Sequence, residues 1–161
     1  MKRARRIRVF VVLTLLVLAI SASTALPALA CGGCGCPPGT GTPGYWMNHP
    51  EAWPKAAEQF TIGGVTYTKE KAIEIMKHPV KRDKTYTMFP ALVAAKLNVM
   101  IGNRADCIQY WIGQGIWWLS LYPVGSDVRG SDEAWQYSHG EAIYLMLDDY
   151  NNGRLCAPSR D

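Results

Sequence analysis

DKTYTMFPALVAAKLNVMI, residues 83–101, has clear helical periodicity and predicts the longest helix of the chain. Its large apolar residues recur mostly at steps of three and four, as on one face of an α-helix: Phe89, Leu92, Val93, Leu97 and Met100. Asp83 is the predicted N-cap, and Gly102 ends the pattern. Because Pro90 lies inside the pattern, we expect the first turn and a half to be kinked or not helical.

Shorter elements are predicted before this helix. Residues 48–51, with Pro50 at the first helical position, predict a short helical turn. The segment 60–67 predicts a β-hairpin, because two β-prone runs flank a Gly-Gly turn. Thr68 can cap a helix over residues 69–77.

Three further helices are predicted after it. Asp106 can cap one that ends before Pro123, with six residues on one inward face: Cys107, Tyr110, Trp111, Trp117, Trp118 and Leu121. Ser131 can cap a short helix, and Ser138 with Glu141 forms a capping box for a helix through Tyr150. The sequence therefore predicts a mainly α, small, single helical domain with one short β-hairpin, stapled by a disulfide.

The N-terminus has the pattern of a signal peptide over residues 1–30. A cationic start is followed by a 12-residue apolar run from Val9 to Ile20, too short to span a bilayer, and by an Ala-x-Ala cleavage site. Five of the 17 Lys and Arg and none of the 13 Asp and Glu lie there, so residues 31–161 carry 12 against 13, a net −1. We therefore expect a secreted or cell-surface protein with no nucleic-acid partner.

The five cysteines are expected to form disulfides, as is usual outside the cytosol. Cys107 and Cys156 are the predicted pair, which would close a loop of about 50 residues and stabilise the fold by about 4 kcal/mol. Cys31, Cys34 and Cys36 lie in a Gly- and Pro-rich segment, residues 31–44, that reads as a flexible tail. A local disulfide is favoured there over a soft-metal site, and Cys31 is also a candidate for lipidation after signal cleavage.

Residues 45–161 are expected to form the compact domain. The stretch GTPGYWMNHPEAWP, residues 41–54, resembles the opening signature of an uncharacterised family of secreted bacterial proteins, whose members usually carry Lys in place of Met47. The stretches 62–68, 94–98 and 148–153 also resemble that family. The resemblance implies an exported, compact, mainly helical domain and assigns no activity, ligand or catalytic residue.

The favoured function is a non-enzymatic domain that binds an unknown extracellular or envelope partner. Tyr45, Trp46, His49 and Trp53 are the candidate binding residues, because aromatic side chains on an irregular segment often form ligand platforms. No nucleophile elbow, zinc-protease motif or phosphate loop occurs, and no cofactor is predicted.

Two other functions remain open. One is a secreted hydrolase acting on envelope polymer, with His49 as general base and Glu51 as its helper. Residues two apart on a helix point in nearly opposite directions, so this pair is not expected to share a face. The other is a redox or metal-handling lipoprotein, with membrane contact through a lipid on Cys31 and with Cys31, Cys34 and Cys36 as any metal ligands.

Overall fold

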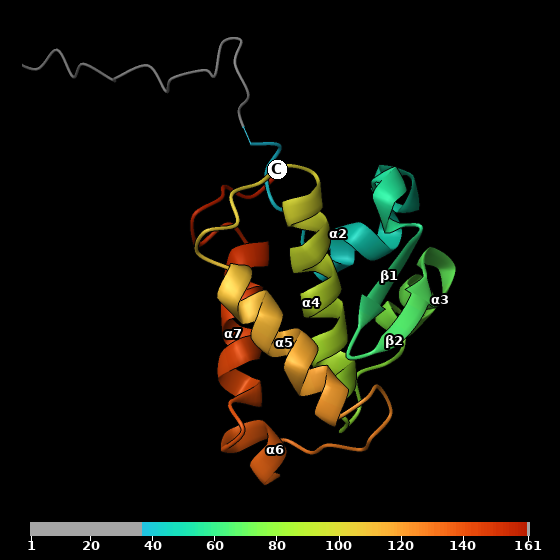
Figure 1. The fold of residues 1–161 in the computed structure, drawn as a ribbon, viewed down its shortest axis with the longest axis vertical. Helices are drawn as coiled ribbons and strands as arrows, with labels where there is room; N and C mark the ends of the chain where they lie inside the picture. Colours follow the sequence, from blue (N-terminus) through green and yellow to red (C-terminus); the bar gives the residue numbers. More distant parts are fainter. Residues whose placement is uncertain (1–36, 161) are drawn as a thin grey trace, which may run out of the picture. The chain divides into compact units, whose positions relative to one another are not determined.

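The computed structural model describes residues 37–160, so the predicted signal peptide and the cysteines at 31, 34 and 36 lie outside the described residues. Within that range the chain forms six α-helices, two 3-10 helices and one antiparallel hairpin, which confirms the predicted fold class (Figure 1). In chain order these are α2 (Pro43–Asn48), η1 (Pro50–Ala52), η2 (Lys55–Ala57), β1 (Gln59–Ile62), β2 (Val65–Thr68), α3 (Lys69–Met76), α4 (Thr85–Met100), α5 (Gln109–Leu121), α6 (Glu133–Gln136) and α7 (Gly140–Asn151).

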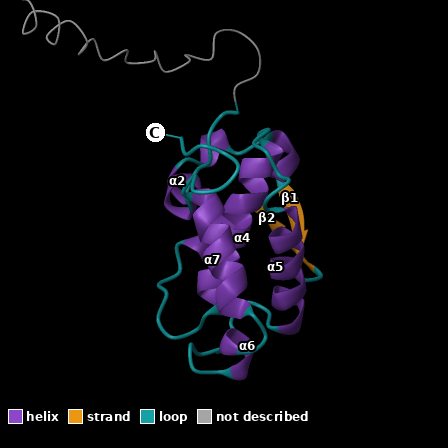
Figure 2. Ribbon diagram, turned by 90° about the vertical axis from the view of Figure 1, so that its left-hand side faces the viewer, coloured by secondary structure: helices purple, strands orange, loops and turns teal. Residues whose placement is uncertain are grey.

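Helix α4 is the centre of this domain. It packs against α2, α3, α5 and α7, and Figures 1 and 2 show α5 and α7 lying along it. Most of its side chains are buried, from Thr85 to Asn98, because neighbours surround it on several sides. A helix that is apolar around most of its circumference is typical of a buried position.

The start of α4 differs from its prediction. The helix is continuous from Thr85 through Pro90, so the alternative of a non-helical first turn and a half is wrong. Asp83 does satisfy its first turn, since its Oδ1 accepts hydrogen bonds from the Thr85 N–H (2.9 Å) and hydroxyl (2.8 Å). The residue at the N-cap position itself is Lys84.

Three later helices begin two or three residues after their predicted caps. Helix α5 begins at Gln109, because the Asp106 carboxylate pairs with Arg104 instead of capping. Helix α6 follows Asp132 rather than Ser131. Helix α7 begins at Gly140, where a Cβ would lie 2.9 Å from the Trp118 indole nitrogen, so the helix start packs closely on this ring.

The hairpin forms as predicted, with Ile62 opposite Val65 across the Gly63-Gly64 turn. Both glycines have positive φ, +58° and +82°, which favours residues without a Cβ. A Cβ on Gly63 would also lie 2.7 Å from the backbone of Leu119, so this turn lies directly against α5.

The ordered domain begins before Tyr45, the predicted boundary. Thr40 is buried and forms a parallel bridge with Ser159, and its N–H donates to the carbonyl of Pro158 (2.7 Å). Helix α2 follows at Pro43. The expected flexible segment 31–44 is therefore too long at its C-terminal end, because its last residues have backbone partners near the end of the chain.

A buried amide network fixes this first segment against α4. The Asn98 side-chain oxygen accepts from the Gly41 N–H (2.7 Å) and from the Trp46 indole N–H (3.0 Å). Its nitrogen donates to the Gly41 carbonyl and to the Asn151 side-chain oxygen, both at 2.9 Å. Asn151 in turn donates to the Ala91 carbonyl (2.9 Å). Each polar atom of the Asn98 amide is thus paired inside the core.

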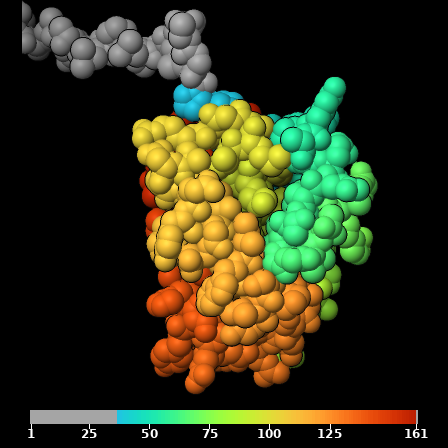
Figure 3. Space-filling view, viewed as in Figure 1, coloured from blue at the N-terminus to red at the C-terminus, as the bar shows by residue number. Residues whose placement is uncertain are grey.

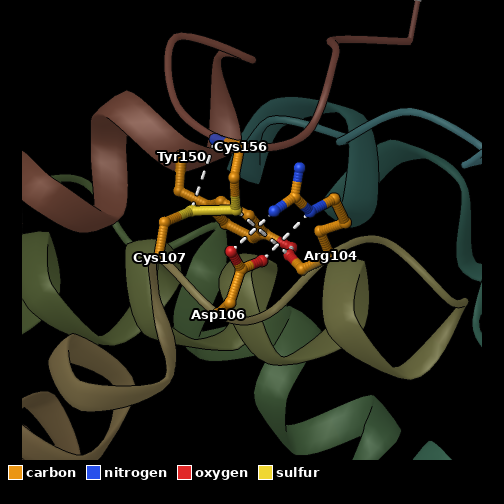
Figure 4. Close-up of a disulfide and its surroundings, with 5 residues drawn as sticks. All are labelled: Arg104, Asp106, Cys107, Tyr150 and Cys156. Atoms are coloured by element: carbon orange, nitrogen blue, oxygen red, sulfur yellow. Dashed lines mark hydrogen bonds and ion pairs between the residues drawn. A yellow bond between two sulfur atoms is a disulfide. The ribbon is translucent and has the colours of Figure 1, made fainter.

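Cys107 and Cys156 form the predicted disulfide, with their Cα atoms 6.0 Å apart (Figure 4). It joins the segment before α5 to the tail that follows α7. Beside it, the Tyr150 hydroxyl donates to the Arg104 carbonyl (2.7 Å), and the Arg104 guanidinium pairs with Asp106 (2.7 Å). Burial, with a smaller contribution from the Asp106 charge, raises the pKa of Tyr150 to about 12.

Candidate binding surface

The two tryptophans of the predicted binding segment are core residues. Trp46 is 0 % exposed and Trp53 is 5 % exposed. The Trp46 indole donates to Asn98, and the Trp53 indole donates to the Trp46 carbonyl (2.8 Å). With their rings buried and their N–H groups paired inside the domain, neither can form the surface platform expected from the sequence.

Tyr45 and His49 do lie at the surface, and their rings stack with centroids 4.6 Å apart. The Arg160 guanidinium lies over the Tyr45 ring at 4.8 Å and donates to its hydroxyl (2.8 Å). This arrangement ties the start of α2 to the C-terminal tail. Because the Tyr45 ring already contacts Trp46, His49 and Arg160, the predicted platform is reduced to His49.

His49 and Glu51 meet, which corrects the expectation that they would not share a face. The His49 Nδ1 lies 2.9 Å from the Glu51 carboxylate. The helical geometry assumed in the prediction does not apply, since His49 has φ −121° and ψ 66° at the junction of α2 and η1. The Glu51 N–H and then the His49 contact lower the pKa of Glu51. Both side chains are exposed, and within residues 37–160 Glu51 is the only side chain hydrogen-bonded to His49.

Helix α5 presents the aromatic surface that the sequence did not locate. Its inward residues are Ile112, Gly115, Trp118 and Leu119, whereas Tyr110, Trp117 and Leu121 are 66 %, 48 % and 52 % exposed. The predicted shared inward face for these last three is therefore wrong. We name Tyr110, Gln114, Trp117 and Leu121 the α5 face; Figure 3 shows α5 at the surface beside the hairpin.

Packing explains which side of α5 faces inward. A Cβ on Gly115 would lie 3.1 Å from Leu92, so this glycine permits close contact with α4. Trp118 turns the other way from its neighbour Trp117, and its indole N–H donates to the Ala134 carbonyl (2.8 Å). Adjacent residues on a helix cannot face the same side, which leaves Trp117 at the surface.

A cavity of about 170 Å³ lies beside the α5 face, where α5 meets the start of α7. Its lining residues are Tyr110, Trp111, Gln114, His139, Ala142 and Ile143. The first four of these side chains carry a group that can form a hydrogen bond, and the rest of the wall is aromatic or aliphatic carbon. His139 has a positive φ of 59°, uncommon for a residue with a Cβ. Apolar walls with a few polar groups are typical of small-ligand sites.

A second cavity, of about 180 Å³, lies between α4 and α5. Lys96 is its charged residue, with Val99, Met100, Gln109 and Ile112 around it. Burial lowers the pKa of Lys96. In the part of the chain that the structure covers, Lys96 forms no ion pair. Neither α4 nor α5 carries an acidic residue that could supply one.

Sequence reasoning missed the α5 face because it assigned all aromatic residues of the helix to the core. No residue from 109 to 121 is charged, so no polar side marks which residues of this helix face solvent. That absence was the available signal, because a surface helix without charge must expose some of its apolar side chains. Gln114 and His139 become neighbours only through the packing of α5 on α7, so no sequence spacing joins them.

Among residues 37–160, no three His, Cys, Asp or Glu side chains come together as metal ligands would. No helix in the same range has both the length and the apolar character needed to cross a bilayer. Comparison with protein-family models, with curated proteins and with solved structures found no match to this chain.

Proposed function

We propose that this protein is an exported, non-enzymatic domain that binds a component of the cell envelope or an extracellular partner through the α5 face. The observation that carries this proposal is the outward position of Tyr110 and Trp117 on a helix without charge, beside a partly polar cavity. Large apolar side chains grouped on a surface often mark interaction sites.

The remaining features of the domain are consistent with a stable scaffold for such a surface. The disulfide and the Asn98 network hold the segments that flank α4 and α5. Helices carry binding side chains more rigidly than loops do, so the α5 face changes little in shape between free and bound states.

A sedimentation assay tests the proposal. The exported protein is mixed with isolated envelopes of the producing cells, and the fraction that sediments is measured. We expect Trp117→Ala and Tyr110→Ala to reduce that fraction several-fold without lowering the thermal unfolding midpoint. Tyr137→Ala is the matched control, because Tyr137 is 75 % exposed but lies outside α5. Equal sedimentation of all four proteins would contradict the proposal.

The alternative function, a secreted hydrolase of envelope polymer, is favoured by one observation, the 2.9 Å contact between His49 and Glu51. A carboxylate in this position orients an imidazole as a general base. Release of soluble fragments from envelope polymer, abolished in His49→Ala and in Glu51→Gln, would support it. No release by the wild-type protein would eliminate it.

The third possibility, a redox or metal-handling lipoprotein, depends on Cys31, Cys34 and Cys36. An intact mass of the exported protein gives the cleavage site, any lipid on Cys31 and the number of disulfides together. Metal analysis of the same sample tests for a bound ion.

A further inference from the structure

The size of the α5 face limits what it binds. An aromatic side chain buries roughly 150–250 Å² when fully covered, so three large side chains about half exposed offer on the order of 300 Å². A stable protein–protein interface needs roughly 800 Å² from each partner. The face is therefore small for a second copy of this chain or a folded partner, and its area suits a narrower ligand.

The charge of the α5 face limits the chemistry of that ligand. No residue from 109 to 121 is charged, so nothing on the helix compensates a charged ligand. The polar groups of the adjoining cavity belong to Tyr110, Trp111, Gln114 and His139. A ligand with apolar ring faces and uncharged hydroxyl edges matches both features, and a pyranose sugar has this form. The axial C–H groups of such a ring carry partial positive charge and suit the negative face of an aromatic ring.

The spacing of the two aromatic residues indicates a chain of sugars. Tyr110 and Trp117 are seven residues apart, which separates them by about 10.5 Å along the helix and turns them only about 20° from each other. Two successive units of an extended β-1,4-linked glycan span a similar length, so alternate units present the same ring face at this interval. Two positions lie between them on the same side: Gly113, which is exposed and has no side chain to obstruct a ligand, and Gln114, which lines the adjoining cavity.

We propose that the α5 face binds an uncharged β-1,4-linked glycan, with one sugar on Tyr110 at the mouth of the Gln114–His139 cavity and another on Trp117. This inference rests on the proposed function and names the class of its ligand. A linear glycan contacts a helix along its length and needs little width, in keeping with the position of α5 at the surface in Figure 3.

Titration of the exported protein with hexasaccharides tests the inference, with isothermal titration calorimetry as the readout because its signal does not depend on Trp117. The probes are the β-1,4-linked hexamers of glucose and of N-acetylglucosamine, with the α-1,4-linked glucose hexamer as the stereochemical control. We expect saturable binding of at least one β-linked hexamer, weakened about tenfold or more by Trp117→Ala and by Tyr110→Ala. Tyr137→Ala is expected to bind as the wild type does, and the matching β-linked disaccharide to bind more weakly than its hexamer.

Each contrary result has a distinct meaning. Equal affinity for the α-linked hexamer, or unchanged affinity in both α5 variants, overturns the glycan inference. Sedimentation with envelopes that depends on Trp117 but is not competed by any hexamer overturns the inference and leaves the proposed function standing. If no hexamer binds and sedimentation with envelopes does not depend on Trp117, both the glycan inference and the proposed function are overturned. A concentration-dependent dimer that Trp117→Ala abolishes, seen by analytical ultracentrifugation, would assign the α5 face to self-association and also overturn the inference.

Discussion

Replacing Asn98 with alanine is predicted to remove a large part of the stability of the domain. Asn98 is 0 % exposed, and its amide satisfies four groups: the N–H and carbonyl of Gly41, the Trp46 indole N–H and the Asn151 side-chain oxygen. A buried polar group left without a partner costs about 1–3 kcal/mol. At the lower end of this range, four such groups give a loss of about 4 kcal/mol.

The assay is urea unfolding followed by tryptophan fluorescence, with the free energy of unfolding obtained by linear extrapolation. Because a domain of this size is stabilised by only about 5–15 kcal/mol, Asn98→Ala is expected to shift the midpoint to much lower urea or to prevent folding. Asn151→Ala gives an intermediate test. It removes one bond to Asn98 and one to the Ala91 carbonyl, and we expect a loss of about 2 kcal/mol.

Asn152→Ala is the matched control. Its side chain is only partly buried and donates one hydrogen bond, to the Asp148 carbonyl (2.7 Å), so its replacement is expected to cost about 1 kcal/mol or less. A loss in Asn98→Ala no larger than that in Asn152→Ala would refute the reasoning. Faster amide exchange at Gly41 in Asn151→Ala would show separately that the network holds the first segment of the domain.

Three further predictions concern the disulfide, the buried phenol and the hairpin turn. Replacing Cys107 and Cys156 with alanine should lower the free energy of unfolding by about 4 kcal/mol, the loop-closure value for their separation of 49 residues, and thiol titration of the wild type should show this pair oxidised. Because the folded pKa of Tyr150, about 12, exceeds its ordinary 10.0, the protonated phenol contributes stability that is fully present below pH 10 and is lost as pH rises towards 12. Tyr150→Phe should cost about 1 kcal/mol at neutral pH and reduce this alkaline loss of stability. An unchanged dependence of the free energy of unfolding on pH between 10 and 12, measured by urea unfolding, would contradict this. Gly63→Ala should lower the melting temperature clearly more than Gly64→Ala, since both have positive φ but only the first would place a Cβ 2.7 Å from the backbone of α5; equal midpoints in thermal scans would show that the turn moves freely.

The sequence was sufficient for the elements whose signals are local. The apolar spacing of residues 83–101 predicted α4, the Gly63-Gly64 pair predicted the hairpin turn, and Thr68 caps α3 by accepting from the Lys71 N–H (3.3 Å). The predicted disulfide also formed. These predictions held because each depends on local backbone preferences or, for the disulfide, on two cysteines that both lie next to predicted helices.

The candidate site was less predictable because it depends on contacts between distant segments. Trp46 is buried because Asn98, 52 residues later, accepts from its indole. Trp117 is exposed because Trp118 faces the core, and the apolar pattern of α5 does not distinguish the two. The His49–Glu51 contact arises from a change of chain direction between two short helices, which residue spacing on one helix cannot represent.

The bridge between Thr40 and Ser159 brings the two ends of the described part of the chain together. In Figure 1 both segments lie at the same end, away from α6. Polypeptide segments attached at these two positions would leave from the same end of the domain. The domain would then project from a longer chain as a side branch and add almost nothing to the length of that chain. A stretching force between the two attachment points would act first on this bridge. Helix α5 lies in the chain between the two bridged residues, so it would carry little of that force while the bridge holds.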